Sequence, residues 1–294
     1  MQKVPDHSIF SQNRKRRFKD ASIFREIFSE IVMQCIKQNI VSSETGVADG
    51  SFLPSNVSWS SRYEAVESIK HSTIKYMKEL DAELAAMPEY SEPEEVETEK
   101  KCLKSHTDKD CGYIHQKRKK GLGYLVEMTV DTKYGIITGV DCYPANKRES
   151  DIILEHLKNQ PCRYQKIALD AGYDIGAVHR GLELLDIDGY TAIREYQNNA
   201  MKKGFLYDEQ KDAFICRKGK YLQFQKLIYK KSSQNYYRLY THPRKQCKEC
   251  PMFSACATDL GTVRINASAY YPSFYRNNQK VRSPEYLKVM RLRQ

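Results

Sequence analysis

Two aspartates in this chain have surroundings typical of metal-binding carboxylates. Asp49 follows the short apolar stretch 46–48, Asp170 ends the apolar stretch 166–170, and a glycine lies one or two residues beyond each. A carboxylate at the end of a central strand lies at the mouth of an α/β sheet, where ligands usually bind. Two of them could hold two divalent metals about 3.5–4 Å apart, as phosphodiester transfer requires. Carboxylate oxygen suits Mg²⁺ or Mn²⁺, although either Asp-Gly pattern alone is more often a simple turn.

A second group of candidate ligands consists of four cysteines. Cys247, Cys250 and Cys256 form a C-x₂-C-x₅-C pattern, and Cys216 lies upstream. Reduced thiols at this spacing favour a tetrahedral structural Zn²⁺ site, with His242 as a substitute ligand. The apolar content of residues 200–262 is modest, so zinc is expected to supply much of their local stability. A redox C-x-x-C pair and unrelated thiols are the alternatives.

The charge of the chain predicts a polyanionic partner. The formal net charge is +11 and the isoelectric point is near 9.1. Residues 200–250 are strongly basic and interleaved with tyrosines, a pattern suited to phosphate contacts and base stacking. The other candidate DNA contacts are two basic runs and the pair before a predicted helix, namely Arg14, Lys15, Arg16, Arg17, Lys117, Arg118, Lys119, Lys120, Lys147 and Arg148. Any one run alone is more often a solvated surface.

Composition excludes several classes of protein. Hydrophobic residues make up 40% of the chain, but no apolar run approaches the roughly 20 residues of a membrane span. The amino-terminal residues have no apolar segment of the signal-peptide type. Nine cysteines without an export signal are expected to be thiols or metal ligands. We therefore expect a cytoplasmic protein.

Hydrophobic periodicity predicts a mixed α/β fold. Residues 20–39 and 60–87 read as helices, and the acidic stretch 89–99 reads as a linker or loop. Residues 122–130 and 135–140 form a predicted β-hairpin. A helix at 150–159, a strand at 166–170, a helix to about Leu185 and a strand at 189–193 follow. This order indicates a mixed sheet with helices on its faces.

Three segments resemble the DDE transposases of bacterial insertion sequences. They are "VADGSFLPSNVS" around Asp49, "YLVEMTVDTKYGIITGVDCYPANKRESD" across residues 124–151, and "IALDAGYD" around Asp170. The most similar branch also carries a cysteine-containing insertion. The resemblance implies an RNase H-like fold with a small, zinc-ribbon-like insertion, and makes Asp49 and Asp170 the first and second catalytic acids. Asp131 is then expected to be a turn residue and Asp174 a helix cap.

The resemblance also implies a reaction and a third acid. Water would cleave a phosphodiester at the transposon end, and the freed 3′-hydroxyl would attack target DNA without a covalent protein intermediate. The third carboxylate would be a glutamate a few residues after a basic segment resembling "SPEYLKVMRLRQ", within which this chain ends at Gln294. Glu285 precedes the basic stretch and does not align with it. The chain is therefore expected to be truncated, and inactive or nearly so by itself.

Four regions are expected along the chain. They are a basic linker and helix at 1–45, an RNase H-like core at 46–199 with an acidic insertion at about 60–115, a basic cysteine-containing insertion at 200–262, and a return to the core at 263–294. Double-stranded DNA is the expected partner, with a homodimer as the candidate assembly and the nucleoid as the location. The alternatives to a transposase core are a zinc-stabilised DNA-binding remnant without catalysis and an RNase H-like nuclease.

Overall fold

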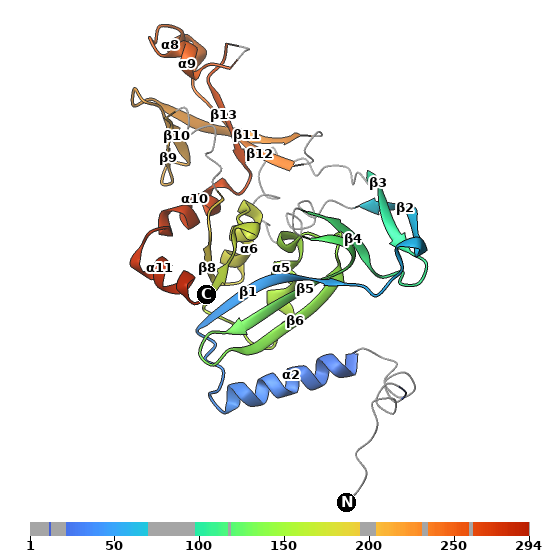
Figure 1. Cartoon of the computed structure of the whole chain (residues 1–294). Helices are drawn as coiled ribbons and strands as arrows, with labels where there is room; N and C mark the ends of the chain where they lie inside the picture. Colours follow the sequence, from blue (N-terminus) through green and yellow to red (C-terminus); the bar gives the residue numbers. More distant parts are fainter. Residues whose placement is uncertain are drawn as a thin grey trace, which may run out of the picture.

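The computed structural model describes residue 12 and residues 22–69, 98–116, 119–194, 204–230, 235–258 and 261–293 (Figure 1). These residues form a six-stranded mixed sheet, a five-stranded antiparallel sheet and a two-stranded hairpin. In Figure 1 the five-stranded sheet stands above the mixed sheet, and helix α2 lies beneath it. None of the helices in the described ranges is both long and apolar enough to cross a membrane.

The mixed sheet is built around strand β1. Its order is β4-β5-β1-β7-β8, and β6 pairs with β5. Strand β5 is antiparallel to each of β1, β4 and β6, whereas β7 is parallel to both β1 and β8. Its strands are β1 (Thr45–Pro54), β4 (Gly112–His115), β5 (Lys120–Asp131), β6 (Ile136–Pro144), β7 (Lys166–Leu169) and β8 (Asp188–Thr191). A mixed sheet flanked by helices agrees with the expected fold class.

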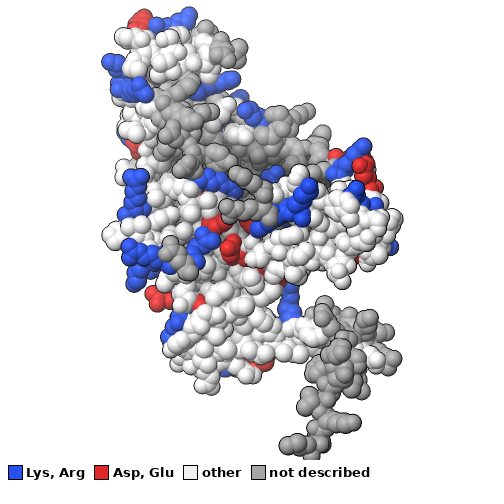
Figure 2. Space-filling model, in the orientation of Figure 1, with Lys and Arg blue, Asp and Glu red and all other residues white. Residues whose placement is uncertain are grey.

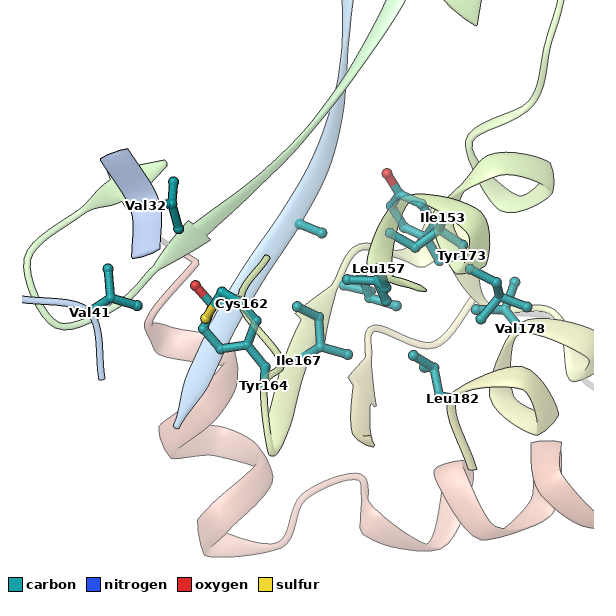
Figure 3. Close-up of a cluster of buried hydrophobic side chains, with 13 residues drawn as sticks. Val32, Val41, Ile153, Leu157, Cys162, Tyr164, Ile167, Tyr173, Val178 and Leu182 are labelled. Atoms are coloured by element: carbon teal, nitrogen blue, oxygen red, sulfur yellow. The ribbon is translucent and has the colours of Figure 1, made fainter. Parts of the chain in front are cut away.

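Three helices cover one face of this sheet. They are α2 (Ser22–Lys37), α5 (Glu149–Asn159) and α6 (Gly176–Leu184). Their apolar sides meet alternate residues of the strands in one buried cluster, in which Ile153, Ile167 and Leu169 have no exposed surface (Figure 3). Each buried leucine or isoleucine contributes about 1.5–3 kcal/mol to folding, so this cluster fixes which face of β1 and β7 points inward.

The C-terminal helices cover other parts of the core. Helix α11 (Pro284–Arg291) packs Tyr286 and Val289 against Ala168 of β7 and Tyr190 of β8. Ala168 alternates with the inward-facing Ile167 and Leu169, so α11 lies on the opposite face from α5. Helix α10 (Tyr271–Lys280) packs beside α6.

The five-stranded sheet has a core of its own. Its order is β13-β12-β11-β10-β9, and its strands are β9 (Leu206–Asp208), β10 (Ala213–Ile215), β11 (Tyr221–Lys230), β12 (Asn235–Thr241) and β13 (Arg264–Ser268). Phe214 and Tyr240 are completely buried, and Tyr207 and Tyr271 pack edge to face with their neighbours. The sequence predicted modest apolar content for this segment, yet its residues Phe205, Tyr207, Phe214 and Tyr240 give the core four buried aromatic rings. Short helices α8 (Arg244–Lys248) and α9 (Phe253–Cys256) precede β13.

Residues 60–87 differ from the expected helix where they are described. The short 3₁₀ turn η1 (Trp59–Ser61) leads into strand β2 (Arg62–Ile69), which pairs with β3 (Thr98–Ser105). Tyr63 and Ala65 are half-buried while Glu64 and Val66 are exposed, a period of two that marks a strand. Residues 70–87 lie outside the described residues. The other predicted helices and strands are confirmed within two residues at each end, except that β6 continues to Pro144, four residues beyond its predicted end.

Candidate active site

Asp49 and Asp170 lie on neighbouring parallel strands of the mixed sheet. Val47 of β1 is in register with Ala168 of β7. Asp49 lies two residues after Val47, and Asp170 lies two residues after Ala168. Asp49 shares with Val47 the face of β1 that carries α11, whereas Asp170 lies one residue beyond the end of β7, at the edge of the sheet beside it. Asp49 does not end its strand as expected, because β1 continues to Pro54 alongside β5 whereas β7 ends at Leu169.

The Asp49 carboxylate faces solvent and one cation. Its side chain is 58% exposed, and Oδ2 lies 3.6 Å from Nη2 of Arg293, which follows α11. Its Oδ1 accepts a hydrogen bond from the backbone nitrogen of Gly50 at 2.9 Å. The carboxylate is thus accessible and only partly neutralised.

Asp170 opens a tight turn immediately after β7. Its Oδ1 accepts a hydrogen bond from the Gly172 nitrogen at 2.5 Å, which caps the 3₁₀ turn η2 (Ala171–Tyr173). Arg194 donates from Nε to the Ala171 carbonyl and from Nη2 to the Gly172 carbonyl, at 2.5 and 2.6 Å. The guanidinium therefore holds the turn that positions Asp170.

Two glutamates that the sequence did not single out lie near the aspartates. Glu127 of β5 is directly opposite Gly50 in the ladder and has no exposed surface. Its Oε1 accepts a hydrogen bond of 2.6 Å from the Tyr173 hydroxyl, while Oε2 finds no hydrogen-bond partner among the described residues. The pKa of Glu127 is raised to about 8, mainly by burial; the hydrogen bond from Tyr173 opposes this rise, and the negative charges of Glu149, Asp49 and Asp170 contribute to it.

Glu149, the first residue of α5, occupies a space left by two glycines. A Cβ atom at Gly50 would lie 2.6 Å from Glu149 Cγ, and one at Gly172 would lie 3.0 Å from Glu149 Oε2 and 2.7 Å from Asp170 Oδ1. Lys119 donates from Nζ to Glu149 Oε1 at 3.0 Å and to the Gly50 carbonyl at 3.1 Å. The glycine after each aspartate was the sequence signal for this neighbour, and Gly50 lies within a strand and not in a turn.

The predicted DNA contacts divide into three groups. Lys119 is at the carboxylates, whereas Lys120, Lys147 and Arg148 are exposed nearby, the last two just before α5. Arg14, Lys15, Arg16, Arg17, Lys117 and Arg118 lie outside the described residues. Figure 2 shows a small group of acidic side chains near the middle of the face in view, with basic side chains on both sides.

Other acids that the sequence raised lie elsewhere. Glu285 forms an ion pair of 2.6 Å with Lys166 at the start of β7, the end of the strand opposite to Asp170. Asp131 ends β5 and accepts hydrogen bonds from the Ser42 nitrogen and the Lys133 nitrogen, in agreement with a turn residue.

Asp174 has a different role from the helix cap expected for it. Ile175 is the N-cap residue of α6, while Asp174 pairs with His179 at 2.9 Å and accepts a hydrogen bond from the Arg194 nitrogen at 2.9 Å. The reason is that η2 ends at Tyr173, which turns the Asp174 side chain toward α6 and Arg194. Asp174 therefore joins two segments behind the Asp170 turn.

The four cysteines line one small cavity of the second sheet. Cys216, Cys247, Cys250 and Cys256 surround about 30 Å³ together with His242. Burial raises the pKa of Cys247, and the other three thiols add to this effect against the influence of Lys220. His242 Nδ1 lies 2.8 Å from the Tyr221 carbonyl, and its Nε2 is buried with no hydrogen-bond partner among the described residues. The bond at Nδ1 leaves Nε2 as the acceptor nitrogen.

The donor chemistry of the two groups differs. The carboxylates near Asp49 and Asp170 supply the hard oxygen atoms that Mg²⁺ and Mn²⁺ prefer, and the cysteine group supplies the sulfur and nitrogen atoms that Zn²⁺ prefers. Within the described part of the chain, no three or more His, Cys, Asp or Glu side chains stand in a ready-made metal-binding arrangement. Side-chain rotations would therefore have to accompany the binding of a cation at either place.

Comparison with known proteins agrees with the class that the sheet and the acids define. The model of the family described as "Transposase DDE domain" matches residues 80–293, which include Glu127, Glu149 and Asp170 but begin after Asp49. Because the match covers most of the chain, the protein belongs to this DDE transposase family. Membership implies DNA binding and nuclease or transposase activity in general, and family members generally use divalent metals such as Mg²⁺. Neither the curated proteins nor the solved structures yielded a match.

Proposed function

We propose that this chain contains the site of metal-dependent DNA strand cleavage and strand transfer in transposition of an insertion sequence, on an RNase H-like core. The supporting observation is the register of β1 and β7, in which Asp49 of β1 lies next to the point where β7 ends and Asp170 follows. Asp49 and Asp170 would hold the divalent cations. Mg²⁺ or Mn²⁺, when bound, supplies activation of the attacking oxygen and stabilisation of the leaving oxygen.

The chain's own residues then position the Asp170 carboxylate and neutralise the charge of the DNA phosphates. The Asp170 turn is fixed by Arg194, so this carboxylate loses little freedom on binding a cation. The exposed Lys120, Lys147 and Arg148, which lie within two residues of Lys119 or Glu149 in the sequence, would contact the phosphates of double-stranded DNA. Such contacts position DNA without reading its sequence.

The test is cleavage of supercoiled plasmid and of labelled duplex DNA with Mg²⁺ or Mn²⁺. Because this chain is expected to be inactive or nearly so by itself, the assay compares it with a chain extended through the expected third glutamate. In the extended chain, Asp49→Asn and Asp170→Asn should reduce cleavage to background, while Glu285→Gln, an acid at the other end of β7, has no effect. Nicking without joining would favour an RNase H-like nuclease. DNA binding unaffected by both aspartate variants, with no cleavage by the extended chain, would favour a non-catalytic DNA-binding remnant.

We propose in addition a structural Zn²⁺ bound by Cys216, Cys247, Cys250 and Cys256, with His242 able to replace one thiolate. The shared cavity and the unpartnered His242 Nε2 support this proposal. Because the second sheet has its own aromatic core, zinc would order α8 and α9 and would not be needed to fold the sheet. Protein purified without chelator should contain about one Zn²⁺ per chain, and Cys247→Ser should lower that content whereas Cys142→Ser, an exposed thiol, should not.

Location and assembly follow from the same role. A transposase acts on chromosomal DNA, so we propose a cytoplasmic, nucleoid-associated protein. We also propose a homodimer, because a transposition reaction joins two transposon ends. Light scattering with and without DNA tests the assembly, and a monomer in both conditions would contradict it.

A further inference from the structure

Glu149 lies beside β1 and the turn after β7 because Gly50 and Gly172, which have no side chains, leave room for it. Its Cγ and Oε1 fill the space that a Cβ at Gly50 would take, and its Oε2 lies within 3.0 Å of the point where a Cβ at Gly172 would stand. Asp170 Oδ1 lies within 2.7 Å of that same point. The carboxylates of Glu149 and Asp170 are therefore close neighbours.

The ammonium group of Lys119 binds Glu149 from the side of β1. It donates to Glu149 Oε1 and to the Gly50 carbonyl oxygen, two hard oxygen atoms of the kind that bind divalent cations. The Lys119 side chain is 31% exposed and that of Glu149 is 23% exposed, so solvent weakens this ion pair only in part. The positive charge of the Lys119 ammonium group thus lies at the edge of the acidic group.

Glu127 provides independent evidence that the group of carboxylates around Glu149 lacks a positively charged or hydrogen-bonding partner. In an antiparallel ladder, directly opposed residues stand on the same face, so Glu127 shares the face on which Gly50 makes room for Glu149. It is fully buried, and its Oε2 has no hydrogen-bond partner within the described ranges. A buried carboxylate oxygen without a donor costs free energy unless a cation or bound water satisfies it.

We propose that Glu149 adds a further carboxylate, beside Asp170, to the cation site of Asp49 and Asp170, and that Lys119 is the counter-ion displaced when a divalent cation binds. This inference rests on the proposed function for the presence of that site. A divalent cation near Glu149 would repel the ammonium group, while the Glu149 oxygen atom released by Lys119 would become available as a ligand.

The proposal is tested by Mn²⁺ affinity of the full chain in the absence of DNA, measured by calorimetry and by electron paramagnetic resonance of free Mn²⁺. Glu149→Gln should weaken Mn²⁺ binding about tenfold, whereas Glu155→Gln, an exposed acid on the same helix, should change it less than about twofold. Lys119→Met should tighten binding about three- to tenfold, and Lys119→Arg should leave it near the parent value.

Lys158→Met is the control for Lys119, because this lysine is exposed in the last turn of α5, at the other end of the helix from Glu149. It should change the affinity less than about twofold. Equal effects of Glu149→Gln and Glu155→Gln, or weaker binding by Lys119→Met, would overturn the proposal. If Glu149→Gln fails to fold by circular dichroism, the Lys119 variants decide alone. Unchanged affinity in Asp49→Asn and Asp170→Asn would instead disprove the proposed cation site itself.

Discussion

The two sheets treat buried charge in opposite ways. In the second sheet the buried Arg238 donates to Asp212 Oδ2 at 2.5 Å, and the hydroxyls of Tyr207 and Tyr240 donate to Asp212 Oδ1 at 2.7 Å each. Although burial opposes it, these hydrogen bonds and the Arg238 charge hold the pKa of Asp212 below its usual value. In the mixed sheet the buried Glu127 has one tyrosine donor and three acidic neighbours, and its pKa is raised.

This is the difference expected between a structural network and the ligand site proposed above. Fully satisfied buried charges rigidify the fold around them. Carboxylates that share a region without enough donors raise the free energy of the protein until a cation or proton joins them, a feature of functional sites. The second sheet is thus expected to lose stability when a charge is removed, whereas the mixed sheet is expected to gain it.

Removal of the Asp212 charge should give the largest effect. Asp212→Asn keeps a residue that tolerates the positive φ of 43° at this position, but leaves Arg238 buried without its counter-charge. We expect a loss of about 3–5 kcal/mol, visible as faster amide hydrogen exchange in β11 and β12. Glu209→Ala removes a partly exposed partner of Arg276 and should cost less than about 1 kcal/mol. Similar exchange rates in the two variants would contradict a structural role for the Asp212 network.

Removal of the Glu127 charge should have the opposite sign and depend on pH. A folded-state pKa of about 8, above the usual 4.5, means that the folded protein binds the proton more tightly than the unfolded chain. This contribution to stability is complete below pH 4.5 and is lost as the pH rises through 8. Glu127→Gln should match the parent at pH 5 and exceed it by about 2–4 kcal/mol at pH 9.

The measurement is urea unfolding from pH 5 to pH 9 with a chelator present, so that metal binding does not contribute. Glu155→Gln serves as the control, because this exposed acid on α5 should leave the pH dependence of the parent unchanged. A constant difference between Glu127→Gln and the parent at all pH values would mean that the buried carboxyl does not titrate in this range.

A methyl group at position 50 should have an intermediate effect. Gly50→Ala places a carbon 2.6 Å from Glu149 Cγ, and such overpacking costs about 1–3 kcal/mol. In a Glu149→Ala background the same substitution should cost less than about 1 kcal/mol, because the obstructing side chain is gone. A double-mutant cycle in urea tests this, and equal costs in the two backgrounds would show that Glu149 does not occupy the glycine space.

Single surface lysines should give the smallest effects and show how the two sheets share DNA binding. Lys120→Ala in the mixed sheet and Lys226→Ala in the second sheet both remove an exposed charge. Each should lower the slope of log affinity against log salt by about one if the lysine contacts a phosphate. Lys158→Ala, exposed at the end of α5, is the control. An unchanged slope for Lys226→Ala alone would restrict DNA contact to the mixed sheet.

Local features of the fold could be predicted from the sequence, and pairings across it could not. The hairpin near Asp131 and the helix from Glu149 depend on nearby residues, and the structure has both. The segment 62–69 was misread because its strand character depends on pairing with β3, distant in the sequence. In the site, the motifs indicated Asp49 and Asp170. Glu127 and Glu149 were missed, since one depends on strand register and the other on how α5 begins against two glycines.

The space shared by Gly50, Gly172 and Glu149 limits how this family can diverge. A mutation that adds a side chain at either glycine is tolerated only if position 149 has already shortened, and a lengthened residue at 149 requires both glycines to persist. The residues at these three positions are therefore expected to constrain one another, although more than a hundred residues separate the first from the last. In an alignment of relatives they should vary together, and a relative that carries alanine at position 50 should carry a residue smaller than glutamate at position 149.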